Sequence, residues 1–351
     1  MGSATRIRLS LSAQAEKYAR KDAPVEVRRM AARGALPLEP VELATVLFAL
    51  AHDPDTEVKT RAGESLESLP ESVVAAVLDG PTHPAVLSHL AHVHHTRETH
   101  CEKIALNPAA DDSTLAFLAT LPLRQVLDII SNNQERLLRS DEIVEAIGAN
   151  PLTGRAVIDR ILVFLGVDDE DELSGSDDIS SGDAEAAVRA LLGEEMADVA
   201  RCLASENDLD NEALSNNLFS ALQKMNVIQR IKLARVGGKE ARTLLVRDRN
   251  KVVSAAVISS PRLTSVEVIA ITKSRSVSEE ILRMIARNRE WTKHYQVKSS
   301  LATNPKCPLS EATKLLNYLQ DKDLRTIMKS KDVPAAISSH ARRILTKKGR
   351  V

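Results

Sequence analysis

The sequence predicts an all-α protein, a superhelical α-solenoid in which pairs of helices stack into one or two sub-arrays. The composition is the first reason: 43% of the 351 residues are hydrophobic and 27% are charged, but only 2% are aromatic. Strands favour aromatic and β-branched side chains, whereas a chain rich in Ala, Leu and charge favours packed helices. The other two reasons are internal repetition and the placement of proline between apolar segments of helical period.

A short repeat occurs near the N-terminus, where residues 25–36 match residues 56–66 at an offset of 31. The offset pairs Val27 with Val58 and Ala31 with Ala62, and the apolar positions recur four residues apart. This spacing places them on one face of a helix.

Longer repeats follow. Residues 102–118 match residues 145–161 at an offset of 43, which aligns Asn107-Pro108 with Asn150-Pro151. Residues 252–271 match residues 296–315 at an offset of 44, which aligns Glu267 with Glu311. Proline lacks the backbone N–H and restricts the residue before it, so Asn-Pro is expected to end one helix and open the next. Each unit therefore reads as helix, turn, helix, and must stack on its neighbours to bury its apolar face.

The pattern D-x-x-x-E-V-(R/K)-x-x-A, around Asp22 and Pro54, resembles HEAT repeats. The Asn-Pro units are similar to the related leucine-rich-repeat-variant helices. The resemblance covers residues 20–166 and 210–345 and implies a fold without specifying an activity. The cysteine-rich iron–sulfur segment of the best-known leucine-rich-repeat-variant proteins is absent, so the resemblance implies no cluster.

The two parts of the chain carry opposite net charges. Residues 1–222 carry 19 Lys and Arg against 38 Asp and Glu, and residues 223–351 carry 28 against 10. The stretch 166–186 holds nine acids, no base, and several Gly and Ser, a composition typical of flexible segments. We expect an acidic HEAT-like array over 1–166, an acidic linker or insertion over 167–187, and a basic helical array over 188–351. The linker is a candidate internal competitor for the basic half.

Several function classes lack their sequence signatures. Cys101, Cys202 and Cys307 form no CxxC pair, which argues against a disulfide framework or a cysteine zinc site. The motifs GxGxxG, GxxxxGK[ST], GxSxG and HExxH do not occur. The first residues hold no apolar stretch long enough for a signal peptide, and no window approaches eighteen uninterrupted apolar residues, so we expect neither a signal peptide nor a membrane-spanning helix. We expect a cytoplasmic, bacterial, non-catalytic protein without a cofactor, a small-molecule substrate or a membrane contact. Gly237-Gly238 is expected to end a helix in a left-handed cap.

Histidines form the first candidate site, because six of the nine lie between His83 and His100. His89 and His92 are three residues apart, a spacing that suits a zinc or nickel ion on a helix face. The run HVHHTRETH also reads as an exposed turn whose histidines suit the end of a helix. We favour the turn and predict no native metal site. A pH-responsive contact is the milder alternative.

Basic clusters in the C-terminal half form the second candidate site, for nucleic acid or another polyanion. Its residues are Arg247, Arg249, Lys251, Lys273, Arg275, Arg283, Arg287, Arg289, Trp291 and Lys293. If the repeats align them, they form a ridge that follows phosphates. Trp291 would stack on a base there, although a packing role between repeats is favoured.

Binding of a partner protein by a non-catalytic scaffold is the leading hypothesis, and nucleic-acid binding is the alternative. HEAT-like DNA glycosylases for alkylated bases provide a remote enzyme hypothesis by resemblance. They use a carboxylate among aromatic side chains, and here only Glu290 adjoins Trp291.

Overall fold

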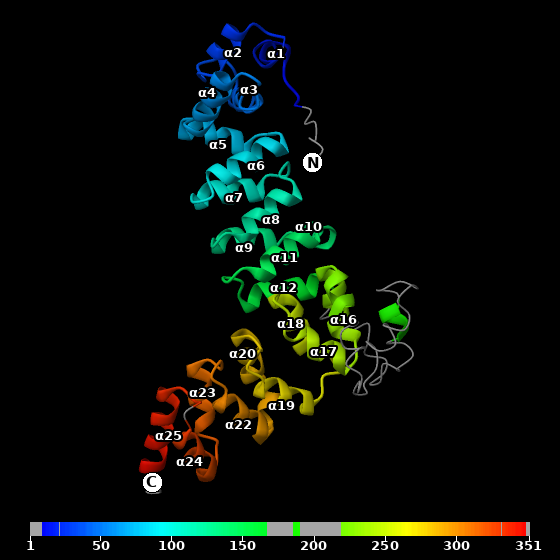
Figure 1. Ribbon diagram of the computed structural model, residues 1–351, viewed down its shortest axis with the longest axis vertical. Coiled ribbons are helices and arrows are strands. Elements are labelled where there is room, and N and C mark those ends of the chain that lie inside the picture. The colour runs from blue at the N-terminus through cyan, green and yellow to red at the C-terminus, as the bar shows by residue number, and fades with distance from the viewer. Residues whose placement is uncertain (1–8, 21, 167–184, 190–218, 331, 349–351) are drawn as a thin grey trace. The chain divides into compact units, whose positions relative to one another are not determined.

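A computed structural model describes residues 9–20, 22–166, 185–189, 219–330 and 332–348 (Figure 1). Every regular element in these ranges is a helix, and none of them contains a strand, which confirms the predicted all-α class. Contacts within the chain define two compact units, Met1–Thr153 and Gly154–Val351. No helix in the described ranges combines the length and the apolar character needed to cross a membrane.

Short helices form both units. The first unit contains α1 (Ala13–Ala19), α2 (Val25–Ala31), α3 (Pro40–Leu50), α4 (Thr56–Glu67), α5 (Glu71–Asp79), α6 (Pro84–Val93), α7 (Glu98–Leu106), α8 (Asp112–Thr120), α9 (Arg124–Ser131), α10 (Gln134–Arg139) and α11 (Asp141–Ala149). The second contains α12 (Arg155–Phe164), α16 (Val227–Val236), α17 (Lys239–Leu245), α18 (Lys251–Ile258), α19 (Ser265–Lys273), α20 (Glu279–Arg287), α21 (Arg289–Lys293), α22 (Tyr295–Thr303), α23 (Leu309–Leu316), α24 (Asp321–Lys329) and α25 (Ala335–Lys347). Isolated helices of this length are marginal in water, so packing stabilises them.

Most of the acidic surplus lies outside the described residues. Residues 167–218 alone hold 16 Asp and Glu against 2 Lys and Arg, whereas residues 1–166 hold 22 against 17. The predicted linker, 167–187, also lies outside the described residues except for 185–187, which belong to a short helical stretch at 185–189. The basic half, by contrast, is largely described.

The long repeat contains more than the predicted pair of helices. In the second unit, α18, α19 and α20 recur as α22, α23 and α24, with starting residues 42 to 44 positions apart. Glu267 and Glu311 both occupy the third position of their helices, α19 and α23, and are both 8% exposed. The predicted offset of 44 is therefore confirmed. The predicted helix pair is incomplete, because a third helix follows each second one without a proline to mark its start.

Consecutive repeats are joined by three buried asparagines, Asn107, Asn150 and Asn304, which we call the bridging asparagines. Each ends a helix, and its Nδ2 donates to two carbonyls at the end of an earlier helix. The acceptors are Leu78 (2.7 Å) and Gly80 (3.0 Å), Ala119 (2.7 Å) and Leu121 (2.8 Å), and Thr272 (2.7 Å) and Ser274 (3.0 Å), respectively. Carbonyls at a helix end lack partners within the helix, so the asparagine satisfies them. The Asn-Pro step thus connects repeats as well as ending a helix.

Candidate binding groove

A groove opens between α17 and α19 of the second unit, with a cavity of about 200 Å³. Its lining residues come from these two helices and the segments that follow them. They are Lys239, Arg242, Thr243, Val246, Arg247, Val266, Glu267, Ala270, Ile271, Ser274 and Val277. Below we call it the α17–α19 groove.

A buried ion pair fixes one wall of the groove. Arg242 Nε donates to Glu267 Oε1 at 2.9 Å, and the two side chains are only 1% and 8% exposed. Arg242 also donates from its NH1 group to the Gly237 carbonyl at 2.8 Å. Glu267 Oε2 accepts from the backbone N and the hydroxyl of Thr264 at 2.9 and 2.7 Å. Both charges are therefore engaged inside the protein.

The pKa of Glu267 agrees with this geometry. Burial alone would raise the pKa of Glu267, but the hydrogen bonds from Arg242 and Thr264 outweigh it and hold the pKa below its ordinary value. The carboxylate stays charged near neutral pH and is compensated by Arg242. The wall of the groove is consequently close to neutral.

The floor of the groove is apolar and its rim is cationic. Val246, Ile271 and Val277 are 3%, 8% and 0% exposed, whereas Val266 on α19 is 74% exposed. Among the lining residues Lys239 and Arg247 bring positive charge to the rim, and Glu267 is the sole acid. An apolar depression edged with polar groups is typical of a binding site.

Gly237 positions α17, and not by the predicted left-handed cap. Its φ is −64°, in ordinary extended backbone. A Cβ there would lie 2.6 Å from the Leu233 carbonyl oxygen and 2.8 Å from the Ala241 Cβ. The glycine is thus required for close approach of the two helices.

We expect Gly237→Ala to lower the free energy of unfolding by about 2 kcal/mol, as for an overpacked core. Gly63→Ala is the control, because no atom lies within 4 Å of a Cβ at this position on α4. That change should stabilise by about 0.5–1 kcal/mol through helix propensity. Chemical denaturation measures both, and equal effects of the two substitutions would contradict the close-approach explanation.

The predicted basic ridge is partly neutralised by neighbouring acids. Ion pairs join Arg275 to Asp332 (3.3 Å), Arg283 to Glu279 (2.6 Å) and Glu280 (2.7 Å), Arg287 to Glu311 (3.4 Å), and Lys293 to Glu290 (2.7 Å). Arg247, Arg249, Lys273 and Arg289 are exposed, and in the described part of the chain they have no acid partner. Burial lowers the pKa of Lys251. Of the predicted residues, Arg247 alone lines the α17–α19 groove.

Trp291 lies on the short helix α21 and is half-buried. Its Nε1 is buried and has no hydrogen-bond partner among the described residues. Half-burial is the environment expected for a side chain that packs between helices, with one edge at the surface.

The two histidines considered for a metal pack against different aromatic rings. His89 meets the edge of Phe48 at a centroid distance of 5.7 Å, and His92 stacks on Phe117 at 3.9 Å. His92 Nδ1 is also 2.8 Å from the Ser88 carbonyl oxygen. Within the described ranges, no group of three or more His, Cys, Asp or Glu is placed to hold a metal ion.

The described cysteines, Cys101 and Cys307, are buried and unpaired. Burial raises the pKa of the Cys101 thiol to about 11 and that of Cys307 to about 12. A thiol of such high pKa holds little thiolate near neutral pH, so neither is a reactive nucleophile. Cys202 lies outside the described residues.

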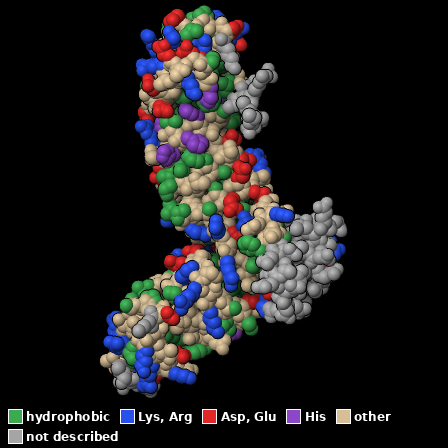
Figure 2. All heavy atoms as spheres, viewed as in Figure 1, with side chains coloured by type: hydrophobic (Ala, Val, Ile, Leu, Met, Phe, Trp, Pro, Cys, Tyr) green, Lys and Arg blue, Asp and Glu red, His purple; other side chains and the backbone are tan. Residues whose placement is uncertain are grey.

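A buried contact between His94 and His100 lies within the histidine-rich part of the first unit, where histidines are purple in Figure 2. Their ring centroids are 4.8 Å apart, and His100 Nε2 is 2.5 Å from Glu71 Oε1. Burial lowers the pKa of His94, and neighbouring His100 and Arg97 add to the shift. Burial likewise lowers the pKa of His89. The fold therefore favours the neutral form of both groups.

Stability should consequently depend on pH. With folded-state pKa values below the ordinary 6.5, His89 and His94 bind fewer protons folded than unfolded as pH falls past this value. We expect the free energy of unfolding to be constant above about pH 7 and to decrease as the pH falls below 6.5. Chemical denaturation at several pH values measures this dependence. His94→Phe should reduce this slope, whereas Thr96→Val, a change at an exposed neighbour without a titratable group, should leave it unchanged. An unchanged slope in the first variant would contradict the assignment.

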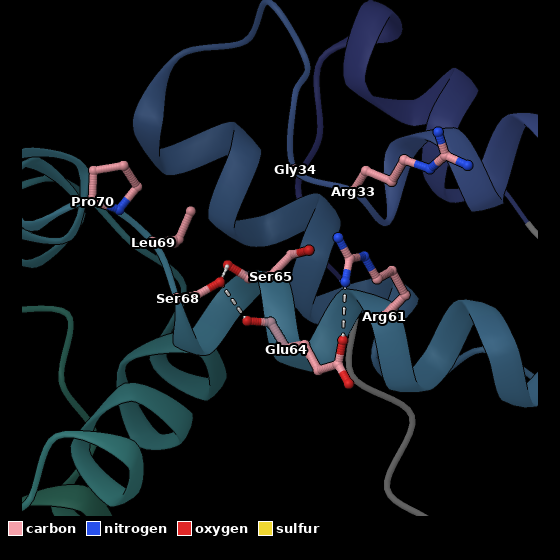
Figure 3. A pocket seen from close by; sticks show the side chains of 8 residues that line it. All are labelled: Arg33, Gly34, Arg61, Glu64, Ser65, Ser68, Leu69 and Pro70. Atoms are coloured by element: carbon pink, nitrogen blue, oxygen red, sulfur yellow. Dashed lines mark hydrogen bonds and ion pairs between the residues drawn. The ribbon is translucent and has the colours of Figure 1, made fainter.

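A second pocket, in the first unit, is lined by two arginines and one acid (Figure 3). It measures about 190 Å³ and includes Arg33, Gly34, Arg61, Glu64 and Ser65. Arg61 donates to Glu64 at 3.2 Å, and Gly34 adopts a φ of 75° at the turn. Its apolar side chains are limited to Leu69 and Pro70, so this pocket offers less apolar surface to a ligand than the α17–α19 groove.

Of the residues that line the α17–α19 groove, the sequence analysis had predicted only Arg247 as a site residue. One signal was available: Ala270 aligns with Lys314 at the offset of 44, so a small residue marks the open position. Comparison with protein-family models gives no match, and comparison with curated proteins gives no relative.

Proposed function

We propose that the protein is a non-catalytic interaction protein, a HEAT-like α-solenoid that binds a partner protein through the second unit. The observation that carries this proposal is the α17–α19 groove, in which an apolar floor is bordered by a 74% exposed Val266 and by cations. An exposed apolar side chain beside a depression is typical of a protein-docking surface. The bridging asparagines support the solenoid, because they join consecutive repeats in the same way.

Nucleic-acid binding is the second candidate function. Arg247, Arg249, Lys273 and Arg289 favour it, since they are exposed and lack an acid partner among the described residues. The four ion-paired positions of the predicted ridge oppose it, because a cation held by an acid neutralises phosphate less effectively. Glu290, the acid nearest Trp291 in sequence, is paired with Lys293. We therefore assign it no catalytic role.

A photo-crosslinking residue at Thr243, in the groove, tests the proposed function against this alternative. We expect adducts with a protein from extracts of the native cells, and no such adduct from the same residue at Ser339 on α25. The adduct protein, once purified, should bind the full chain and lose affinity for Ala270→Phe. Nuclease-sensitive adducts, with binding of a DNA duplex that weakens steeply with salt, would instead support nucleic-acid binding.

A further inference from the structure

We propose that the α17–α19 groove receives an acidic peptide segment of the partner protein, which inserts one apolar side chain into the groove. The inference rests on the proposed function and defines the chemistry of the partner. It follows from three properties of the groove, namely its floor, its rim and its position in the repeat.

The apolar floor of the groove favours an apolar side chain as the group that the peptide inserts. Val246, Ile271 and Val277 are buried at the base, and Ala270 leaves space above them. The cavity of about 200 Å³ is small for a compact ligand, since ligand pockets usually measure roughly 300–1,000 Å³. One branched or aromatic side chain, flanked by chain that lies along the rim, suits it better. Peptide recognition commonly uses such single anchors.

The cationic rim of the groove favours acidic residues on both sides of the inserted side chain. Lys239 and Arg247 border the cavity, and Thr243 and Ser274 add hydroxyl groups. The one acid of the lining, Glu267, is held by Arg242 and Thr264, and Arg247 is exposed without an acid partner among the described residues. A carboxylate beside these groups would form charge-assisted hydrogen bonds, which are stronger than neutral ones. A basic peptide would meet repulsion at the same place.

The next repeat differs from this one at the position of Ala270. Lys314 replaces Ala270 there, and its Nζ lies 3.1 Å from Glu311, which also pairs with Arg287 at 3.4 Å. A long cationic side chain, 70% exposed, thus stands where the preceding repeat has only the methyl group of Ala270. The two repeats therefore differ in size and charge at this position of the lining. The phosphate backbone of a nucleic acid has no apolar group to place on the floor of the groove. The groove therefore favours a peptide over nucleic acid.

Selection of short random peptides displayed on phage, against the full-length protein, tests the inference. We expect enriched peptides to carry Asp or Glu on both sides of one Leu, Ile, Met or Phe. Ala270→Phe should fill the groove and weaken binding of the enriched peptides at least about tenfold, and Arg247→Glu should do the same. The matched controls are Ala335→Phe and Arg343→Glu, exposed positions on α25, which should retain affinity.

The outcomes separate the inference from the proposed function. Groove-dependent peptides without acids, or without an apolar anchor, would overturn the acidic-peptide inference and leave protein binding intact. No groove-dependent peptide, combined with salt-sensitive binding of a DNA duplex, would overturn both. Equal losses in the controls and the groove variants would show that the peptides bind elsewhere and would likewise reject the groove.

Discussion

Asn150→Ala is expected to lower the free energy of unfolding by about 3 kcal/mol, because it leaves two carbonyls at the end of α8 without their donor. Asn150 is 2% exposed, and its Nδ2 lies 2.7 and 2.8 Å from the Ala119 and Leu121 oxygens. Its Oδ1 also accepts from the backbone N of Leu152 at 2.9 Å. Alanine removes these three hydrogen bonds and supplies no donor of its own.

Chemical denaturation followed by helical circular dichroism provides the measurement. Because repeat proteins unfold in parts, hydrogen exchange of α8 and α11 should show where stability is lost. Asn317→Ala is the control: Asn317 is an exposed helix-ending residue, and the change should cost less than about 0.5 kcal/mol. Similar losses for the two substitutions would show that the bridge is unimportant.

Arg242→Met should destabilise the second unit by about 3–5 kcal/mol, the usual effect of leaving one partner of a buried ion pair uncompensated. Glu267 is 8% exposed and would retain only its Thr264 hydrogen bonds. The loss should diminish at acidic pH, because protonation removes the unpaired charge. Thermal and chemical denaturation at two pH values measure the effect.

The double variant Arg242→Met with Glu267→Met is expected to recover much of the loss, since apolar replacements of buried ion pairs are often tolerated. Arg283→Met is the matched control, because its ion pair with Glu279 is 34% and 58% exposed. It should cost less than about 1 kcal/mol. If the double variant were as unstable as the single one, loss of side-chain packing would explain the result better than loss of charge compensation.

The sequence was informative about local structure and about the repeat. Composition predicted helices, and the offset of 44 placed Glu267 and Glu311 at equivalent positions before any helix was located. The third helix of the repeat was missed because α20 and α24 follow Ser278 and Gln320, neither of which is a proline. Proline positions alone therefore did not predict where every helix begins.

Features that join distant parts of the chain were beyond sequence reasoning. The carbonyls bound by Asn150 lie 29 and 31 residues before it, and nothing local identifies them. The α17–α19 groove likewise combines residues of two helices, of which only Arg247 belonged to a visible basic cluster. Arg283 was different: its partners Glu279 and Glu280 are four and three residues away, so this pairing could be predicted from helical spacing.

The bridging asparagines also bear on how such a chain changes length during evolution. The repeat formed by residues 107–149 brings one bridging asparagine, Asn107, and leaves the Ala119 and Leu121 carbonyls for Asn150. Removal of residues 107–149 would place Asn150 directly after Leu106, at the sequence distance from which Asn107 binds Leu78 and Gly80. Duplication of the same segment would add one more donor and one more pair of acceptors. Gain or loss of this whole repeat therefore preserves the junctions on both sides of it, whereas an insertion of a few residues between an asparagine and its acceptors does not.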